Sequence, residues 1–277
     1  MLPAGFQFSQ STLQDYVDCP RRFQLRYILR QAWPGVRTEP LQQHERHMDR
    51  GVQFHRLVQR HQLGIPVEQL ERGLDEELAG WWRAYLGFDL LHSMLGRRYP
   101  EITLSADLSG ARLLAKYDLL VVSPNQGITI FDWKTSLKPL RREFLLKRLQ
   151  THVYPYILAR SGGGLLGTEI SPKQITFCCW NTAAPSEPVI IQYSQEQYQQ
   201  DESYLSGLLA ALRAEVERGP AVWVLTADEH RCRFCEYRSL CGRGEVAGNF
   251  EEMDDFGDEI DPSVADFGLV DVEEIGF

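Results

Sequence analysis

The sequence of 277 residues lacks several features that would place it in other classes of protein. No window reaches the roughly 18 uncharged apolar residues that a membrane-spanning helix needs. The first residues contain no basic start followed by an apolar run, so they do not form a secretory signal. No internal repeat is visible, and the pattern G-x-x-x-x-G-K-[ST] is absent, which excludes an ATP-driven helicase within this chain. We therefore expect a cytoplasmic protein with no membrane contact.

Cysteine is also scarce, with six residues in the chain. A hydrophobic content of 43% suffices for a core without disulfide bonds. In a cytoplasmic protein, cysteines more often bind a metal or a cluster than form disulfides. Cys178 and Cys179 lie in the apolar segment ITFCCW. We interpret these two as core residues, because a free thiol packs as a small hydrophobic group.

Basic residues are missing from the C-terminal segment 249–277, which contains eleven acidic residues. Without those eleven, the chain carries 29 basic and 27 acidic residues, so the net charge of -9 belongs to the tail. A nearly neutral body can still bind nucleic acid where its basic residues cluster. Low hydrophobicity with charge of one sign predicts a disordered tail. Three interpretations of the tail stay open: a solubilising segment, a segment that occupies the chain's own basic cleft, and a contact for a protein partner through its acidic, Phe-terminated end, VDVEEIGF.

Periodic patterns and turn signals divide the rest of the chain into helices and strands. The order is helices, three strands, a helix, two strands and a helix, which predicts an α/β core sheet with a helical insertion over about 30–100. We expect helices at 11–29 (with Ser11 as N-cap and an interruption at Cys19-Pro20), 49–63, 67–95, 142–160 and 194–218, strands at 101–107, 111–122, 127–133, 174–181 and 188–193, and loops at 30–48 and 161–164.

Two carboxylates and a lysine form the first candidate for chemistry. Asp132 and Lys134 are two apart in the predicted strand ITIFDWK, so their side chains share one face. Asp118 lies in the preceding strand and can reach the same place. Mg²⁺ relieves repulsion between paired carboxylates and neutralises charge on a phosphodiester, while a lysine orients water or stabilises the phosphate. Asp-x-Lys alone also arises by chance in strands.

A longer series of residues supports the catalytic interpretation. The order His55, Asp118, Asp132-x-Lys134 and Gln150-x-x-x-Tyr154 resembles the RecB-like branch of the PD-(D/E)XK nucleases, as does the opening segment FSQSTLQDYVDCPRRFQLRYIL. The resemblance covers roughly residues 8–243 and implies a restriction-endonuclease-like mixed sheet flanked by helices. It implies that Mg²⁺ or Mn²⁺ is bound by His55, Asp118, Asp132 and the main-chain carbonyl of Trp133, that Lys134 is catalytic, and that Gln150 and Tyr154 contact DNA or shape the site. Glu101 is a further acidic candidate.

The remaining cysteines suggest a second site. Cys232, Cys235 and Cys241 have the spacing C-x2-C-x5-C, and a four-thiolate site needs one more ligand, for which Cys19 is the candidate. A four-cysteine zinc site has overlapping spacing rules and stays an alternative. AddB nucleases and CRISPR-associated exonucleases of the same branch hold a 4Fe-4S cluster with one cysteine before the nuclease core and three after it. The resemblance therefore implies a 4Fe-4S cluster on these four residues, with 228–243 as the cluster-binding segment.

These features predict a nuclease domain over 1–248 followed by the acidic tail. The resemblance implies a metal-dependent deoxyribonuclease, an exonuclease acting on DNA ends or single strands in repair or recombination. Two alternatives remain: a CRISPR adaptation nuclease that trims spacer precursors, and a non-catalytic DNA-binding scaffold subunit. Basic residues near the motifs are candidates for phosphate contacts: Arg21, Arg22, Lys138, Arg141, Arg142, Lys147 and Arg148.

Overall fold

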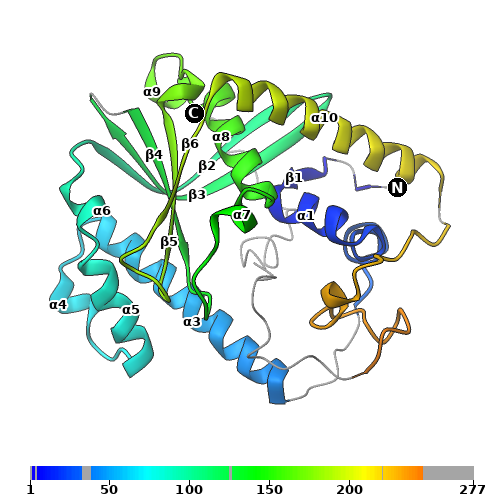
Figure 1. Cartoon of the computed structure of the whole chain (residues 1–277), viewed down its shortest axis with the longest axis horizontal. Coiled ribbons are helices and arrows are strands. Elements are labelled where there is room, and N and C mark those ends of the chain that lie inside the picture. Colours follow the sequence, from blue (N-terminus) through cyan, green and yellow to red (C-terminus); the bar gives the residue numbers. More distant parts are fainter. Residues whose placement is uncertain (1, 4, 33–38, 125–126, 220, 246–277) are drawn as a thin grey trace.

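A mixed β-sheet forms the centre of the chain (Figure 1). The computed structural model describes residues 2–3, 5–32, 39–124, 127–219 and 221–245. Within these residues the sheet has six strands in the order β1-β3-β4-β5-β6, with β2 paired to β3. The strands are β1 (Gln7–Ser9), β2 (Arg97–Leu108), β3 (Ala111–Ser123), β4 (Gly127–Lys134), β5 (Ile175–Asn181) and β6 (Val189–Gln192).

Strand β3 organises the sheet because it has partners along both edges. Strand β2 pairs with it antiparallel over almost its whole length. The opposite edge is shared, with β1 parallel to residues 112–114 at one end and β4 antiparallel to residues 119–123 at the other. Strand β5 then runs parallel to β4, and β6 antiparallel to β5. The mixed sheet flanked by helices that the sequence predicts is confirmed.

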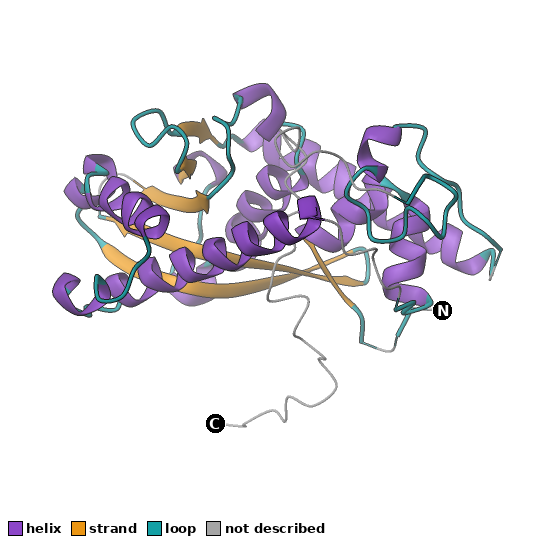
Figure 2. Cartoon of the chain, turned by 90° about the horizontal axis from the view of Figure 1, so that it is seen from below, coloured by secondary structure: helices purple, strands orange, loops and turns teal. Residues whose placement is uncertain are grey.

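Helices cover the two faces of the sheet and bury two hydrophobic cores (Figures 1 and 2). Strand β4 shows the alternation, because Ile128 and Ile130 pack in the first core and Phe131 and Trp133 in the second. The first core is covered by α1 (Gln10–Asp18), α8 (Leu149–Ser161) and α10 (Gln195–Glu217), and the second by α3 (Glu39–Gln62), α5 (Glu76–Leu86) and α6 (Asp89–Ser93).

The alternation in β3 changes phase at Asp118. Ala115 and Tyr117 pack in the first core, whereas Leu119 and Val121, at the same spacing, pack in the second. On the neighbouring strand, Glu101 has a positive φ of 53°, which is unfavourable for a residue with a side chain. The pairing of β2 with β3 is interrupted at these two positions, since Pro100 pairs with Leu119 and Ile102 with Tyr117. The irregularity turns two acidic side chains out of the regular pleat.

The first helix begins two residues earlier than the sequence predicts. Ser9, and not Ser11, is the N-cap of α1, and it forms a capping box with Thr12. Ser11 is already helical, and its hydroxyl lies 2.7 Å from that of Ser9. The interruption at Cys19-Pro20 is confirmed, because Pro20 opens a new helix, α2 (Pro20–Phe23), which continues as the π-helical turn η1 (Gln24–Ile28).

Several other boundaries differ from the prediction. The expected loop over 30–48 is wrong in its second half, since α3 already begins at Glu39, where Pro40 falls in the first turn and its missing N–H is tolerated. The single helix over 67–95 is wrong because Gly73, with a φ of +78°, lets the chain turn between α4 (Val67–Leu70) and α5. The expected helix over 142–160 is two helices, α7 (Arg142–Leu145) and α8, and the expected loop over 161–164 contains the start of α9 (Gly163–Leu166).

The structure describes the N-terminal helices and the cysteine segment but not the acidic tail. The N-terminal helices and the cysteine segment, which includes the turn η3 (Glu229–Cys232), lie side by side (Figure 1). A further turn, η2 (Pro172–Gln174), precedes β5. The acidic tail over 249–277 lies outside the described residues. The proposed division into a domain over 1–248 with an insertion over 30–100 stays a prediction. Among the described helices, none has the length and apolar character to cross a membrane.

Gly127 provides a test of the sheet. Its φ is +83°, and a Cβ added there would lie 2.3 Å from the main-chain oxygen of Gln174, the last residue of η2 before β5. We expect Gly127→Ala to lower the free energy of unfolding by about 2–4 kcal/mol, because the backbone is strained and the atom it meets cannot move aside. The matched control is Gly207→Ala in the exposed part of α10, where nothing lies within 4 Å; it should raise stability by roughly 0.5–1 kcal/mol. Urea denaturation measures the free energy of unfolding of both variants. An equal change in the two would contradict the close contact between Gly127 and Gln174.

Candidate metal and catalytic site

Three potential ligand side chains meet where β3 changes phase. His55 comes from α3, Glu101 from β2 and Asp118 from β3, and one donor atom from each lies within 4.8 Å of the others. His55 Nδ1 is 3.2 Å from Asp118 Oδ1. The three side chains are partly exposed, so solvent can reach them. One imidazole and two carboxylates suit a divalent cation such as Mn²⁺ or Mg²⁺.

Helix α3 brings His55 to the sheet along one stripe of residues. His47, Gly51 and His55 are four apart, so they lie on one face of the helix. The Nε2 of His47 is 2.5 Å from the carbonyl oxygen of Thr135, just after β4. A Cβ at Gly51 would lie 2.9 Å from Thr135 Oγ1, so glycine allows the close approach. These contacts dock α3 on the end of β4 and place His55 beside Asp118.

Asp118 connects this group to β4. Its second oxygen, Oδ2, accepts a hydrogen bond of 2.8 Å from the backbone N–H of Trp133. The regular pairing of β3 with β4 ends one step earlier, at Leu119 and Phe131. The Asp118 side chain therefore accepts a hydrogen bond from β4 where the backbone pairing between β3 and β4 has ended. This bond holds Trp133 and, with it, the neighbouring residues Asp132 and Lys134.

Asp132 and Lys134 flank Trp133 and contact each other. Lys134 Nζ lies 2.8 Å from Asp132 Oδ2, as expected for side chains on one face of a strand. Gln150 in α8 donates to Asp132 Oδ1 at 2.5 Å, and Cys179 Sγ lies 3.8 Å from Oδ2. Among the described residues, Asp132 is not part of the three-donor group. Its oxygens face an ammonium group and an amide that donate to them, whereas Glu101, the further acidic candidate, belongs to the group. Metal binding by Asp132 stays a prediction.

Tyr154 and Trp133 have structural contacts in addition to their predicted roles. Tyr154, four residues after Gln150, is buried in the first core, where its ring centroid is 5.1 Å from that of Tyr117. The Tyr117 hydroxyl donates to the Tyr154 carbonyl at 2.9 Å. The Trp133 ring is buried in the second core, and its backbone N–H holds Asp118. Metal binding by the Trp133 carbonyl stays a prediction.

The charges in the site affect one another. Burial alone would lower the pKa of His55, but the Asp118 carboxylate outweighs it and raises that pKa to about 9. Burial would raise the pKa of Asp118, and the neighbouring His55 and Lys134 lower it instead. Burial and the charge of Asp118 both raise the pKa of Glu101, although Lys116 Nζ lies 2.8 Å from its carboxylate. Glu101 and Asp118 repel each other, and a divalent cation between them would remove that repulsion.

The four predicted cluster cysteines line one small cavity, which contains no residue of the donor group. Cys19 is buried, and the other three are partly exposed. Burial and then the nearby thiolates of Cys19 and Cys241 raise the pKa of Cys232. Cys178 and Cys179 lie in the two cores, 1% exposed each, so their interpretation as core residues is confirmed.

The other functional residues differ in how far the sequence could reveal them. Glu101 follows Pro100 in an ordinary strand pattern, and nothing in that pattern shows its positive φ. His47 and Gly51 could have been found, because they precede His55 at helical spacing. His47 was missed because the sequence predicted a loop over 30–48, where the structure has the first part of α3.

Comparison with known proteins gives a family match over most of the chain. The model of the PD-(D/E)XK nuclease superfamily matches residues 7–242. Two solved structures are similar at low identity. The protein SSO0001 is 12% identical with a TM-score of 0.40, each chain covered to 87%. A presumed exonuclease from Eubacterium rectale is 14% identical with a TM-score of 0.43, with 76% of this chain and 82% of that one covered. Comparison with curated proteins gave no match.

Glu101 is the member of the donor group that the sequence analysis named only as a further candidate, so its contribution is tested separately. We expect Glu101→Gln to weaken Mn²⁺ binding roughly tenfold or more, because the amide keeps the size of the side chain and removes its charge. Isothermal titration measures the affinity. Asp107→Asn is the matched control, an exposed carboxylate on the same strand and outside the donor group. An unchanged affinity in Glu101→Gln would remove Glu101 from the site.

Proposed function

Because the chain belongs to the PD-(D/E)XK nuclease superfamily, we propose that it is a metal-dependent deoxyribonuclease that acts on DNA ends or single strands in repair or recombination. The observation that carries this proposal is the adjacency of two groups. The Asp132–Lys134 pair and the donor group of His55, Glu101 and Asp118 are joined by the hydrogen bond from Trp133 N–H to Asp118. An ammonium group beside a cation site matches what phosphodiester cleavage requires.

The side chains present fit a divalent cation. His55, Glu101 and Asp118 would hold Mg²⁺ or Mn²⁺, with the predicted ligands Asp132 and Trp133 next to them. A bound cation there would neutralise charge on the scissile phosphate and activate water. Lys134, whose positive charge lowers the pKa of Asp118, would donate to a phosphate oxygen or orient the attacking water. Gln150 would keep Asp132 oriented through its amide.

Exposed basic residues supply phosphate contacts near this site. Lys138, Arg141, Arg142 and Lys147 are exposed on the segment between β4 and α8. Arg22, also a candidate from the sequence, is 4% exposed and pairs with Asp15 and Asp18, so its charge is not available to a phosphate. The exposed residues would neutralise DNA phosphates, which predicts binding that weakens with salt.

Catalysis by this site is tested on end-labelled single- and double-stranded DNA with and without Mg²⁺. We expect Asp132→Ala and Lys134→Ala to lower the cleavage rate about 100-fold or more while DNA binding persists, since each removes a group that acts on the reacting phosphate. Lys173→Ala, an exposed lysine away from both groups, is the control and should cleave at the normal rate. Wild-type protein that binds DNA without cutting it would favour the scaffold alternative.

We also propose that the cysteine cavity holds a 4Fe-4S cluster. Cys19, Cys232, Cys235 and Cys241 line it together with Arg22, Arg231 and Arg238. Arg238 is 3% exposed, and its Nε–H has no acceptor among the described residues. Cationic side chains and an unpaired N–H suit an anionic cluster, whose sulfurs accept hydrogen bonds.

The cluster is tested by its metal content. Protein purified without oxygen should be brown and contain roughly four irons per chain. We expect Cys19→Ala to lose iron and thermal stability together, because Cys19 is the ligand that links the N-terminal helices to the C-terminal segment. Cys178→Ala, a buried cysteine outside the cavity, should keep its iron. One zinc per chain without iron would instead support the zinc alternative.

A further inference from the structure

The first turn of α8 depends on a hydrogen bond from a distant part of the chain. Its N-cap residue, Arg148, makes no side-chain cap hydrogen bond. The first N–H groups of a helix have no acceptor within it. Here the N–H of Leu149 donates to Gln14 Oε1 in α1 at 3.0 Å, across 135 positions of sequence. Leu149 is 1% exposed and Gln14 6%, so water cannot easily replace this bond.

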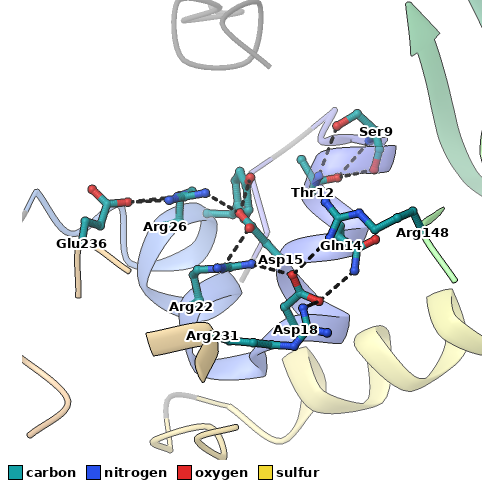
Figure 3. Close-up of polar contacts among 11 residues, drawn as sticks. Ser9, Thr12, Gln14, Asp15, Asp18, Arg22, Arg26, Arg148, Arg231 and Glu236 are labelled. Carbon is teal, nitrogen blue, oxygen red and sulfur yellow. Dashed lines mark hydrogen bonds and ion pairs between the residues drawn. The ribbon is translucent and has the colours of Figure 1, made fainter. Parts of the chain in front are cut away.

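Asp18 fixes the orientation of the Gln14 amide (Figure 3). Gln14 Nε2 donates to Asp18 Oδ1 at 2.8 Å, so its oxygen is the atom that faces Leu149. Asp18 is 5% exposed and is held by Arg22 at 3.1 Å and by an ion pair with Arg231. Arg231 directly precedes Cys232, so the cysteine segment contributes to holding Asp18.

The same turn of α8 carries the amide that holds Asp132. Gln150 follows Leu149 and donates to Asp132 Oδ1 at 2.5 Å. A shift of the first turn of α8 would move Gln150 away from Asp132, because Leu149 and Gln150 belong to the same turn. A continuous series of contacts therefore leads from Arg231 through Asp18 and Gln14 to Asp132.

We propose that Gln14 is a positioning residue that sets Gln150 on Asp132, and that Asp18 makes this arrangement depend on the folded cysteine segment through Arg231. The inference rests on the proposed nuclease function for its kinetic effect. Contiguity alone does not establish energetic coupling, which a double-mutant cycle measures directly.

The cycle combines Gln14→Met with Gln150→Ala. We expect Gln14→Met to lower kcat about tenfold at nearly constant KM, because a lost buried hydrogen bond shifts the turn without touching DNA. In protein that already carries Gln150→Ala, the same change should have almost no further effect. Thr12→Val is the matched control: a buried polar residue on the same helix, bonded to Ser9 and outside the series, which should lower stability and leave kcat unchanged. Equal effects of Gln14→Met in both backgrounds would overturn the proposal.

Amide exchange of Leu149, followed by NMR, tests the contact without relying on activity. In the wild-type chain we expect slow exchange, and fast exchange would overturn the proposal even if no Gln14 variant folds. Arg231→Met should speed this exchange in protein that retains its iron. Arg243→Met, which removes the ion pair to Glu229 in the same segment, should not. An unchanged rate in Arg231→Met would disprove the dependence on the cysteine segment. A wild-type chain that fails to cleave DNA would refute the nuclease function and leave the Leu149 result valid.

Discussion

The carboxylate of Asp118 binds two elements at once, and the candidate site depends on that double contact. One oxygen meets His55 of α3, and the other accepts the Trp133 N–H of β4. A half-buried carboxylate is costly unless its oxygens are paired or hydrogen-bonded, and the His55 and Trp133 contacts satisfy both oxygens. The break in pairing between β2 and β3 makes this side chain available and brings Glu101 to it. The interrupted pairing of β2 with β3 is therefore what brings the carboxylates of the donor group together.

Asp15 and Asp18 join the N-terminal helices to the cysteine segment. Asp15 pairs with Arg22 and Arg26, and Arg26 in turn pairs with Glu236 of the cysteine segment at 2.7 Å. Asp18 pairs with Arg231 of the same segment (Figure 3). Breaking a buried ion pair leaves an uncompensated charge, which costs several kcal/mol. These contacts join the two ends of the described chain in addition to any cluster ligation.

The sequence predicted the parts of the site that follow from periodicity. Asp132 and Lys134 share a face because a strand alternates. Gln150 was implied by the family resemblance and not by periodicity, and its contact with Asp132 came from the structure. The resemblance gave Glu101 only as a further candidate, and strand periodicity could not show how it reaches the site, because that depends on its positive φ. The cap of α8 by Gln14 was equally hidden, since no local pattern links positions 135 residues apart. Boundaries failed where glycine turned the chain, as at Gly73.

Anomalous diffraction from crystals soaked in Mn²⁺ shows whether the donor group at Asp118 holds a divalent cation. We expect a manganese peak within about 2.0–2.6 Å of donor atoms from His55, Glu101 and Asp118. The same peak should be lost in Asp118→Asn. A peak bound elsewhere, or no peak at a concentration that supports DNA cleavage, would contradict this expectation.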